Sequence, residues 1–146
     1  CYIEGTTDFI FGAATALFED CHIHSKKNSH VTAASTNSII PFGFVFKRCT
    51  LTGDSTLNKV SLGRPWSATA SVTYIDCWLG KHIIEEGWNN WKNPANELTA
   101  RYSEYNSTGP GANPSKRVTW SKQLTKEQAD LITTEKIFGA WLPQKK

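Results

Sequence analysis

Residues 17–23 (LFEDCHI) carry a pattern that returns at residues 45–51 (VFKRCTL) and 74–79 (YIDCWL). Each copy has a hydrophobic pair, then one or two charged residues, then a cysteine, any residue and an aliphatic. A shorter copy, Cys1-Tyr2-Ile3, opens the chain, so the cysteines stand at positions 1, 21, 49 and 77. Short strands rich in aliphatic and aromatic residues fit such copies best.

The spacing of these copies predicts a solenoid. Spacings of 20 and 28 residues are typical of one coil per repeat, with equivalent residues stacked above one another. We therefore expect the four cysteines to form an inward ladder of small apolar side chains, since free cysteine is among the most buried residue types. A disulfide between adjacent rungs stays open, whereas no C-x-x-C spacing indicates a zinc site.

The later part of the chain has a different pattern. From about Trp88 onward we expect a tail that covers the coils rather than further coils. Within it, Thr125 stands three residues before Gln128 and ahead of an apolar pair, which predicts a capping box and a short helix.

Composition limits the classes of function. The length of 146 residues suits one domain, and no apolar run approaches the roughly 20 residues that cross a bilayer. A net charge of +3 suits a polyanionic partner but lacks the dense basic patches of a nucleic-acid binder. The chain opens at Cys1 without an initiator Met or a signal segment, so we expect a piece of a longer protein.

The first motif is residues 5–12 (GTTDFIFG), where one carboxylate stands beside an apolar run bounded by glycines. A carboxylate among Phe9, Ile10 and Phe11 loses hydration and needs a partner, as carboxylates in active sites often do. An outward-pointing strand aspartate is the simpler alternative for Asp8.

The second motif is residues 62–66 (LGRPW), where Gly63 and Pro65 fix the backbone on either side of Arg64. Arginine is suited to bidentate pairing with a carboxylate. Trp66 is suited to stacking on a sugar ring. A rigid turn without further function is the alternative.

Both motifs resemble the signatures GxxDFIFG and LGRPW of the pectin methylesterase (pectinesterase) family, in the expected order. Residues 100–112 and 117–120, and the closing Trp141-Leu142-Pro143, are also similar to that family's C-terminal region. The resemblance implies that residues 1–146 are the C-terminal part of a single catalytic domain. It also implies an all-β, right-handed parallel β-helix with a C-terminal tail and short helix covering the coils.

The resemblance further implies an activity and its residues. Asp8 matches the nucleophilic aspartate and Arg64 the arginine that orients it, while Trp66, Phe11 and Thr69 match substrate contacts. The implied reaction is hydrolysis of galacturonate methyl esters in pectin (homogalacturonan), with no cofactor and no metal. The family also implies a secreted or periplasmic enzyme, and we expect a monomer in its full-length form.

One departure from the family pattern bears on activity. The family's second aspartate, in a Gln-Asp-Thr-Leu motif, and the glutamines of its oxyanion hole are absent from this sequence. In the family they precede GxxDFIFG, so we expect the chain to begin after them. Losing these groups removes orders of magnitude in rate, which predicts that the chain alone is a poor catalyst.

Two other functions stay open. A pectate lyase would need a cluster of acidic calcium ligands, for which only Glu19-Asp20 stand together near the motifs. A carbohydrate-binding solenoid without catalysis would use Trp66 and the basic surface alone.

Some further residues have simpler roles. The four histidines, His22, His24, His30 and His82, are expected to be polar residues of the surface because no third metal ligand stands at useful spacing. Trp88 and Trp91 are expected to anchor the tail by packing, and a place in a sugar-binding site is the alternative. Asn106-Ser107-Thr108 is an acceptor sequon for N-glycosylation.

Overall fold

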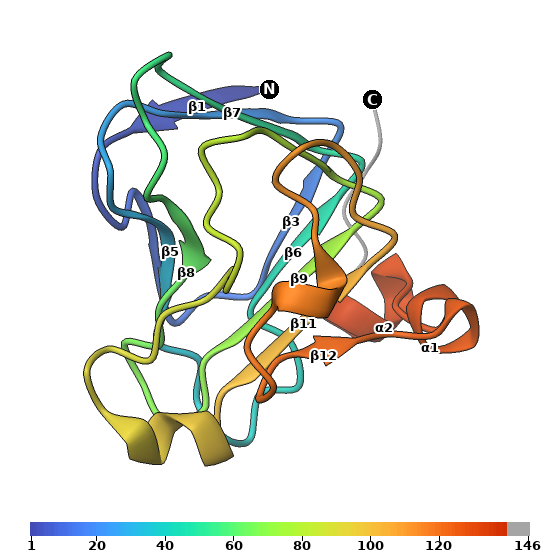
Figure 1. Cartoon of the computed structure of the whole chain (residues 1–146). Helices are drawn as coiled ribbons and strands as arrows, with labels where there is room; N and C mark the ends of the chain where they lie inside the picture. Colours follow the sequence, from blue (N-terminus) through green and yellow to red (C-terminus); the bar gives the residue numbers. More distant parts are fainter. Residues whose placement is uncertain (140–146) are drawn as a thin grey trace.

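The computed structural model describes residues 1–139, which form a stack of coils with three parallel sheets along its sides (Figure 1). The strand order is β1-β4-β7-β10 in the first sheet, β12-β11-β9-β6-β3 in the second and β2-β5-β8 in the third. The bounds are β1 Tyr2–Gly5, β2 Ile10–Gly12, β3 Ala16–Glu19, β4 His22–Ser25, β5 His30–Ala34, β6 Phe44–Lys47, β7 Thr50–Gly53, β8 Ser61–Gly63, β9 Ser71–Ile75, β10 Trp78–Leu79, β11 Arg101–Tyr105 and β12 Lys122–Gln123. The predicted all-β parallel β-helix is confirmed.

The cysteine ladder is confirmed for three of its four members. Cys21, Cys49 and Cys77 are buried on successive coils, and all four thiols are free rather than paired in disulfides. The prediction is wrong for Cys1, which is exposed. Cys1 precedes β1, the edge strand of its sheet, so a described coil covers it on one side only.

A residue with a left-handed backbone conformation forms the corner before Cys21, Cys49 and Cys77. Asp20, Arg48 and Asp76 have φ values of 54°, and Asn106 has 52° at the equivalent corner of the next coil. Side chains link these corners: Arg48 donates to Asp20 and Asn106 donates to Asp76. Asp and Asn tolerate this backbone region better than other side chains, which explains the polar residues of the repeat.

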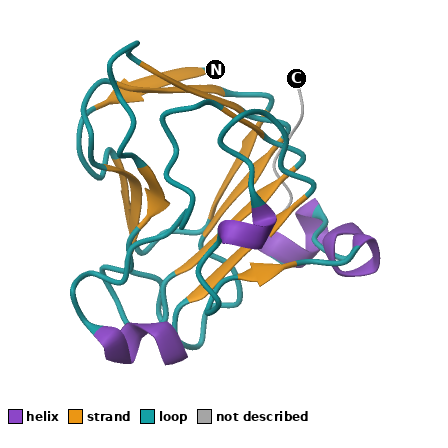
Figure 2. Ribbon diagram, viewed as in Figure 1, coloured by secondary structure: helices purple, strands orange, loops and turns teal. Residues whose placement is uncertain are grey.

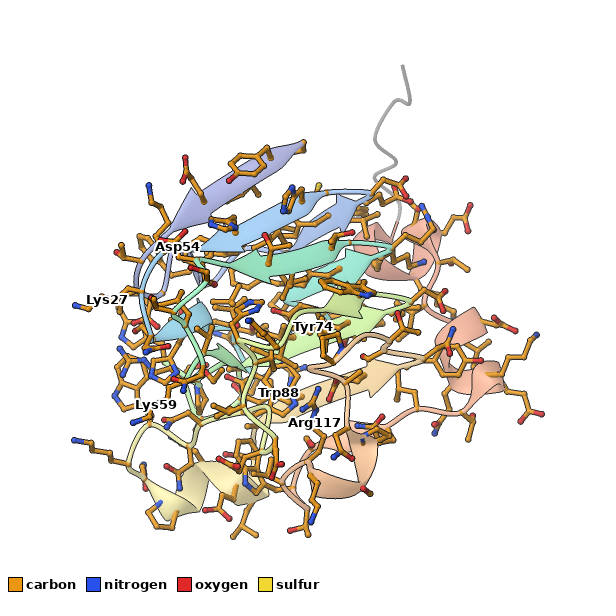
Figure 3. The ribbon with its side chains drawn as sticks, turned by 45° about the horizontal axis from the view of Figure 1, so that its top comes forward. Lys27, Asp54, Lys59, Tyr74, Trp88 and Arg117 are labelled. Atoms are coloured by element: carbon orange, nitrogen blue, oxygen red, sulfur yellow. The ribbon has the colours of Figure 1, made fainter. Side chains whose placement is uncertain are left out.

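Aromatic rings fill the interior of the stack. Phe46 stacks on Phe18 and on Tyr74, with ring centroids 4.6 and 4.5 Å apart. Trp88 stacks on Tyr102 at 4.2 Å, and Figure 3 shows Trp88 beside Tyr74. Each such pair adds about 0.5–1.5 kcal/mol beyond the burial of its apolar surface.

The tail differs from the prediction. β11 pairs in parallel with β9, and β12 pairs with β11, so the chain after Trp88 adds rungs to the second sheet instead of only covering it. The predicted capping box is confirmed at Thr125, which begins α1 (Lys126–Asp130). A second helix, α2 (Thr134–Phe138), and two 3-10 helices, Pro94–Leu98 and Pro114–Lys116, were not predicted (Figure 2).

Two remaining observations complete the fold. The matching string Trp141-Leu142-Pro143 lies outside the described residues. Among residues 1–139, no helix has the length and apolar character needed to span a membrane.

Candidate active site

The third sheet places the two sequence motifs side by side. Asp8 lies just before β2, and its backbone N–H donates to the carbonyl of His30 at the start of β5. Arg64 lies just after β8, and its N–H donates to the carbonyl of Thr32. The parallel pairing of β2 with β5 and of β5 with β8 therefore brings together residues that are 56 positions apart.

Arg64 and Asp8 form a bidentate ion pair. The guanidinium Nε donates to Oδ1 at 3.1 Å, and Nη2 donates to Oδ2 at 2.7 Å. Both side chains are half-buried, at 27% and 20% exposure for Arg64 and Asp8, so the pair is open to a substrate. Two parallel hydrogen bonds fix the plane of the carboxylate as well as its charge.

The backbone at Asp8 is left-handed, with a φ of 48°. Aspartate tolerates this region better than most side chains, and the same conformation occurs at the corner residues Asp20 and Asp76. The prediction that the Asp8 carboxylate needs a partner is met by the Arg64 guanidinium.

Aromatic rings surround this pair. Phe11 and Trp66 are 64% and 54% exposed, and their ring centroids are 6.2 Å apart. Together with Trp91 they line a hollow of about 380 Å³ that also contains Asp8. Large exposed aromatic rings beside a carboxylate form a surface on which sugar rings can stack.

Trp91 lies beside the ion pair, a place that fits the alternative considered for it rather than the favoured one, tail packing. Its ring lies over the Arg64 guanidinium, with the guanidinium carbon 4.1 Å from the ring centroid. Tail packing was expected for it, as for Trp88, and only Trp88 is buried in the core. The signal that could have found Trp91 is the preceding Asn89-Asn90, because asparagine pairs favour turns that aim the next side chain.

Thr69 is not brought to this hollow. Its hydroxyl donates to the carbonyl of Thr36 at 2.9 Å, and its own carbonyl accepts from Arg101. The structure thus gives Thr69 a local role in the connection between β8 and β9.

The family comparison agrees with this geometry. A family model described as Pectinesterase matches residues 1–140. The chain belongs to the pectinesterase family. Pectinesterase 31 of Arabidopsis thaliana is 44% identical over 88% of this chain and 41% of its own length. The chain thus spans about two fifths of this curated relative.

Solved pectin methylesterases share the fold. The enzyme from carrot is 31% identical, covers 97% of this chain and 50% of its own, and superposes with a TM-score of 0.88. The Aspergillus niger enzyme is 30% identical over 96% of this chain and 46% of its own, with a TM-score of 0.83. A pectin methylesterase in complex with a hexasaccharide, 28% identical, covers all of this chain and 51% of its own at 0.82.

The other candidates of the pectinesterase chain have local partners. His22 and His24 both hydrogen-bond the Thr52 hydroxyl, and His24 also contacts Asp54 at 2.7 Å. The predicted surface position is wrong for His82, which is buried because its ring packs against the side-chain-free Gly53 and Gly80. Within residues 1–139 no three His, Cys, Asp or Glu side chains lie close enough together to hold a metal ion.

The acidic pair and the sequon also have structural partners. Glu19 and Asp20 both pair with Arg48. Asn106 of the sequon is exposed and donates its amide to Asp76 at 2.8 Å.

Proposed function

We propose that this chain carries the nucleophile and part of the substrate groove of an enzyme that hydrolyses methyl esters of galacturonate in pectin. The observation that supports this most is the bidentate Arg64–Asp8 pair beneath exposed aromatic rings, in a pectinesterase chain. The hexasaccharide complex of a related enzyme supports an oligosaccharide as ligand. Because pectin belongs to the cell wall, the proposal includes a secreted or periplasmic location.

The first half-reaction is acyl transfer. One Asp8 oxygen attacks the ester carbonyl carbon of a galacturonate C6, and the carbonyl electrons form a tetrahedral oxyanion. Its collapse breaks the bond to methoxide, which leaves as methanol after taking a proton. Arg64 holds both oxygens of Asp8, so the carboxylate presents a fixed edge to the ester.

The second half-reaction restores the carboxylate. Water attacks the acyl carbon of the anhydride between Asp8 and galacturonate, loses a proton, and releases the acid product. Phe11, Trp66 and Trp91 hold the sugar rings so that the ester stays over Asp8 in both steps. No cofactor enters the scheme.

The proton donor and the oxyanion donors lie outside the two motifs of this sequence. No Gln-Asp-Thr-Leu string occurs in it. We therefore propose that residues 1–146 are the C-terminal part of a catalytic domain, and that they release little methanol alone. Loss of an oxyanion donor and of acid catalysis each costs about a hundredfold or more.

The test is methanol release from highly methylated pectin by the complete catalytic domain, with and without Asp8→Asn, in the presence of a chelator. Activity that survives the chelator and disappears with Asp8→Asn supports the aspartyl esterase. A calcium-dependent lyase would instead cleave the chain by elimination, giving an unsaturated product and no methanol, and the chelator would abolish this cleavage. Binding of pectin without methanol from either protein supports a binding solenoid and overturns the proposal.

A further inference from the structure

Two histidine rings on the outer face of the first sheet converge on one oxygen atom. His22 and His24 are alternate residues of β4, so their side chains leave the strand on the face opposite the buried Ile23. The His22 Nε2 and the His24 Nδ1 lie 2.7 and 2.6 Å from the hydroxyl oxygen of Thr52 on the neighbouring strand β7. Two imidazole nitrogens are therefore aimed at the same small volume.

Asp54 contacts the second ring nitrogen of His24. It lies just after β7, and its Oδ1 is 2.7 Å from the His24 Nε2 (Figure 3). A carboxylate accepts a hydrogen bond, so the proton of a neutral His24 ring is held on Nε2 and the lone pair stays on Nδ1. Histidines that bind metal ions almost always donate their other ring N–H to a carboxylate, a carbonyl or water in this way.

His22 can offer its nitrogen after a change of tautomer. Because the His24 Nδ1 is an acceptor, the Thr52 hydroxyl donates to it and accepts the N–H of the His22 Nε2. Moving the His22 proton to Nδ1 frees the Nε2 lone pair, and the ring is exposed, so water can accept the Nδ1–H. The Tyr2 ring packs edge-on against His22, with centroids 4.9 Å apart, which restricts its rotation.

The charge around the two rings suits a cation. Asp54 places one carboxylate beside His24, and Glu4 occupies the position opposite His24 on β1. Lys26 pairs with Glu4 at 3.3 Å, with both side chains about half exposed. Two carboxylates and one ammonium group thus flank the imidazoles, which leaves an excess of negative charge at this part of the sheet.

We propose that His22 and His24 chelate one divalent transition metal ion of the class that prefers imidazole nitrogen, such as Zn²⁺ or Cu²⁺. Water completes the coordination, and Asp54 holds His24 in the binding tautomer. Two nitrogens on one strand make a chelate, so no third His, Cys, Asp or Glu ligand is needed. The site lies on the first sheet and Asp8 lies beside the third, so this inference does not depend on the proposed reaction.

The test is isothermal titration of the 146-residue chain with Zn²⁺, in a Cys1→Ser background that removes the exposed thiol. His22→Gln and His24→Gln should each weaken binding at least tenfold. Asp54→Asn should weaken it about tenfold, the lower end of the range for a partner of a metal-binding histidine, because its side chain is 47% exposed. Cu²⁺ should bind more tightly than Zn²⁺, whereas Ca²⁺, which prefers oxygen ligands, should not bind.

His30→Gln is the matched control, because it removes an imidazole from the third sheet, where His30 contacts the Ser61 hydroxyl. It should leave the Zn²⁺ affinity unchanged. Denaturant unfolding guards against variants that fold poorly: Zn²⁺ should raise the unfolding midpoint of the parent and of His30→Gln, but not that of His22→Gln or His24→Gln.

Three results would each overturn the metal site. The first is a parent chain that binds no Zn²⁺ or binds Ca²⁺ as tightly. The second is equal Zn²⁺ affinity in the parent, His22→Gln and His24→Gln. The third is a loss of affinity in His30→Gln as large as that in His24→Gln. Methanol release by the complete catalytic domain is measured separately, so either the metal site or the proposed reaction can fail while the other stands.

Discussion

Trp91 covers the face of the Arg64 guanidinium, with 4.1 Å between the guanidinium carbon and the ring centroid. The same guanidinium uses its edge for two hydrogen bonds to Asp8. Cation–π contact contributes about 0.5–2 kcal/mol, depending on how far water is excluded. The Asp8 carboxylate is thus held in one orientation by an arginine that is itself fixed at its edge and at its face.

Replacing Trp91 should lower activity through this contact. In the complete catalytic domain we expect Trp91→Leu to lower kcat/KM for methylated pectin about tenfold to a hundredfold, because Arg64 loses its cover and a sugar ring loses its stacking surface. Trp91→Phe, which keeps an aromatic face, should restore most of the activity. Steady-state methanol release checks this.

The control for Trp91 is Trp78→Leu, since Trp78 is an exposed tryptophan of the first sheet. Its removal should leave kcat/KM unchanged. Equal losses in the two variants would mean that Trp91 acts through general surface stacking rather than through Arg64.

Arg64→Lys keeps the positive charge but should still lower the activity of the complete catalytic domain. A lysine ammonium cannot make two parallel hydrogen bonds to one carboxylate, so the plane of Asp8 is no longer fixed. We expect kcat to fall by about a hundredfold, with KM changed less. A variant with near-normal kcat would show that charge alone, and not orientation, is what Asp8 needs.

Asp8 and Arg64 could be found from the sequence because each stands in a motif with its own local signal. Their pairing across 56 positions could not be worked out from the chain, since it depends on the register of β2, β5 and β8. For Trp91 the sequence left two interpretations, a sugar site and tail packing, and packing was favoured for a related reason. Its place over Arg64 depends on a turn of two left-handed residues, Trp91 and Lys92, which the side chains of Asn89 and Asn90 hold.

The extra rungs of the tail were missed because the repeat changes its chemistry there. The equivalent of Asp76-Cys77 is Asn106-Ser107, so the cysteine that marks earlier coils is lost. The left-handed corner itself persists, at positions 20, 48, 76 and 106. A search for a polar corner residue every 28 to 30 positions would have found the fourth corner.

Stability should depend on pH through His82. Its ring lies buried between Gly53 and Gly80, where an added Cβ would come within 2.8 Å of imidazole atoms. Burial, with a smaller contribution from His24, lowers the pKa of His82 to about 4, from the usual 6.5. Because the folded pKa is depressed, this contribution is complete above pH 6.5 and is lost as pH falls toward 4.

The difference corresponds to about 3 kcal/mol in the free energy of unfolding. Denaturant unfolding of the 146-residue chain at pH 7 and pH 4 measures it. His82→Gln should reduce the loss between these pH values by about that amount, whereas carboxyl groups affect both proteins alike. An identical pH dependence in the variant would refute the assignment.

The buried pair of Glu104 and Arg117 should be the most sensitive ionic contact of the described chain. Both side chains are at most 2% exposed, and the guanidinium donates to both oxygens of Glu104 at 2.8 and 3.2 Å. Arg117, labelled in Figure 3, also donates to the carbonyls of Ile84 and Gly111, so one side chain joins β11 to the loop before Trp88 and to a loop of the tail.

Arg117→Met should therefore cost about 3–5 kcal/mol in the free energy of unfolding, because it leaves a buried carboxylate without its partner. Adding Glu104→Gln should recover part of this cost, since the uncompensated charge is then gone. Arg48→Met removes an exposed arginine that pairs with Glu19 and Asp20, and should cost less than about 1 kcal/mol. If Arg117→Met and Arg48→Met lowered the free energy of unfolding equally, burial would not make the Glu104–Arg117 pair more important than an exposed pair. Strand pairing and aromatic packing would then be what holds the tail.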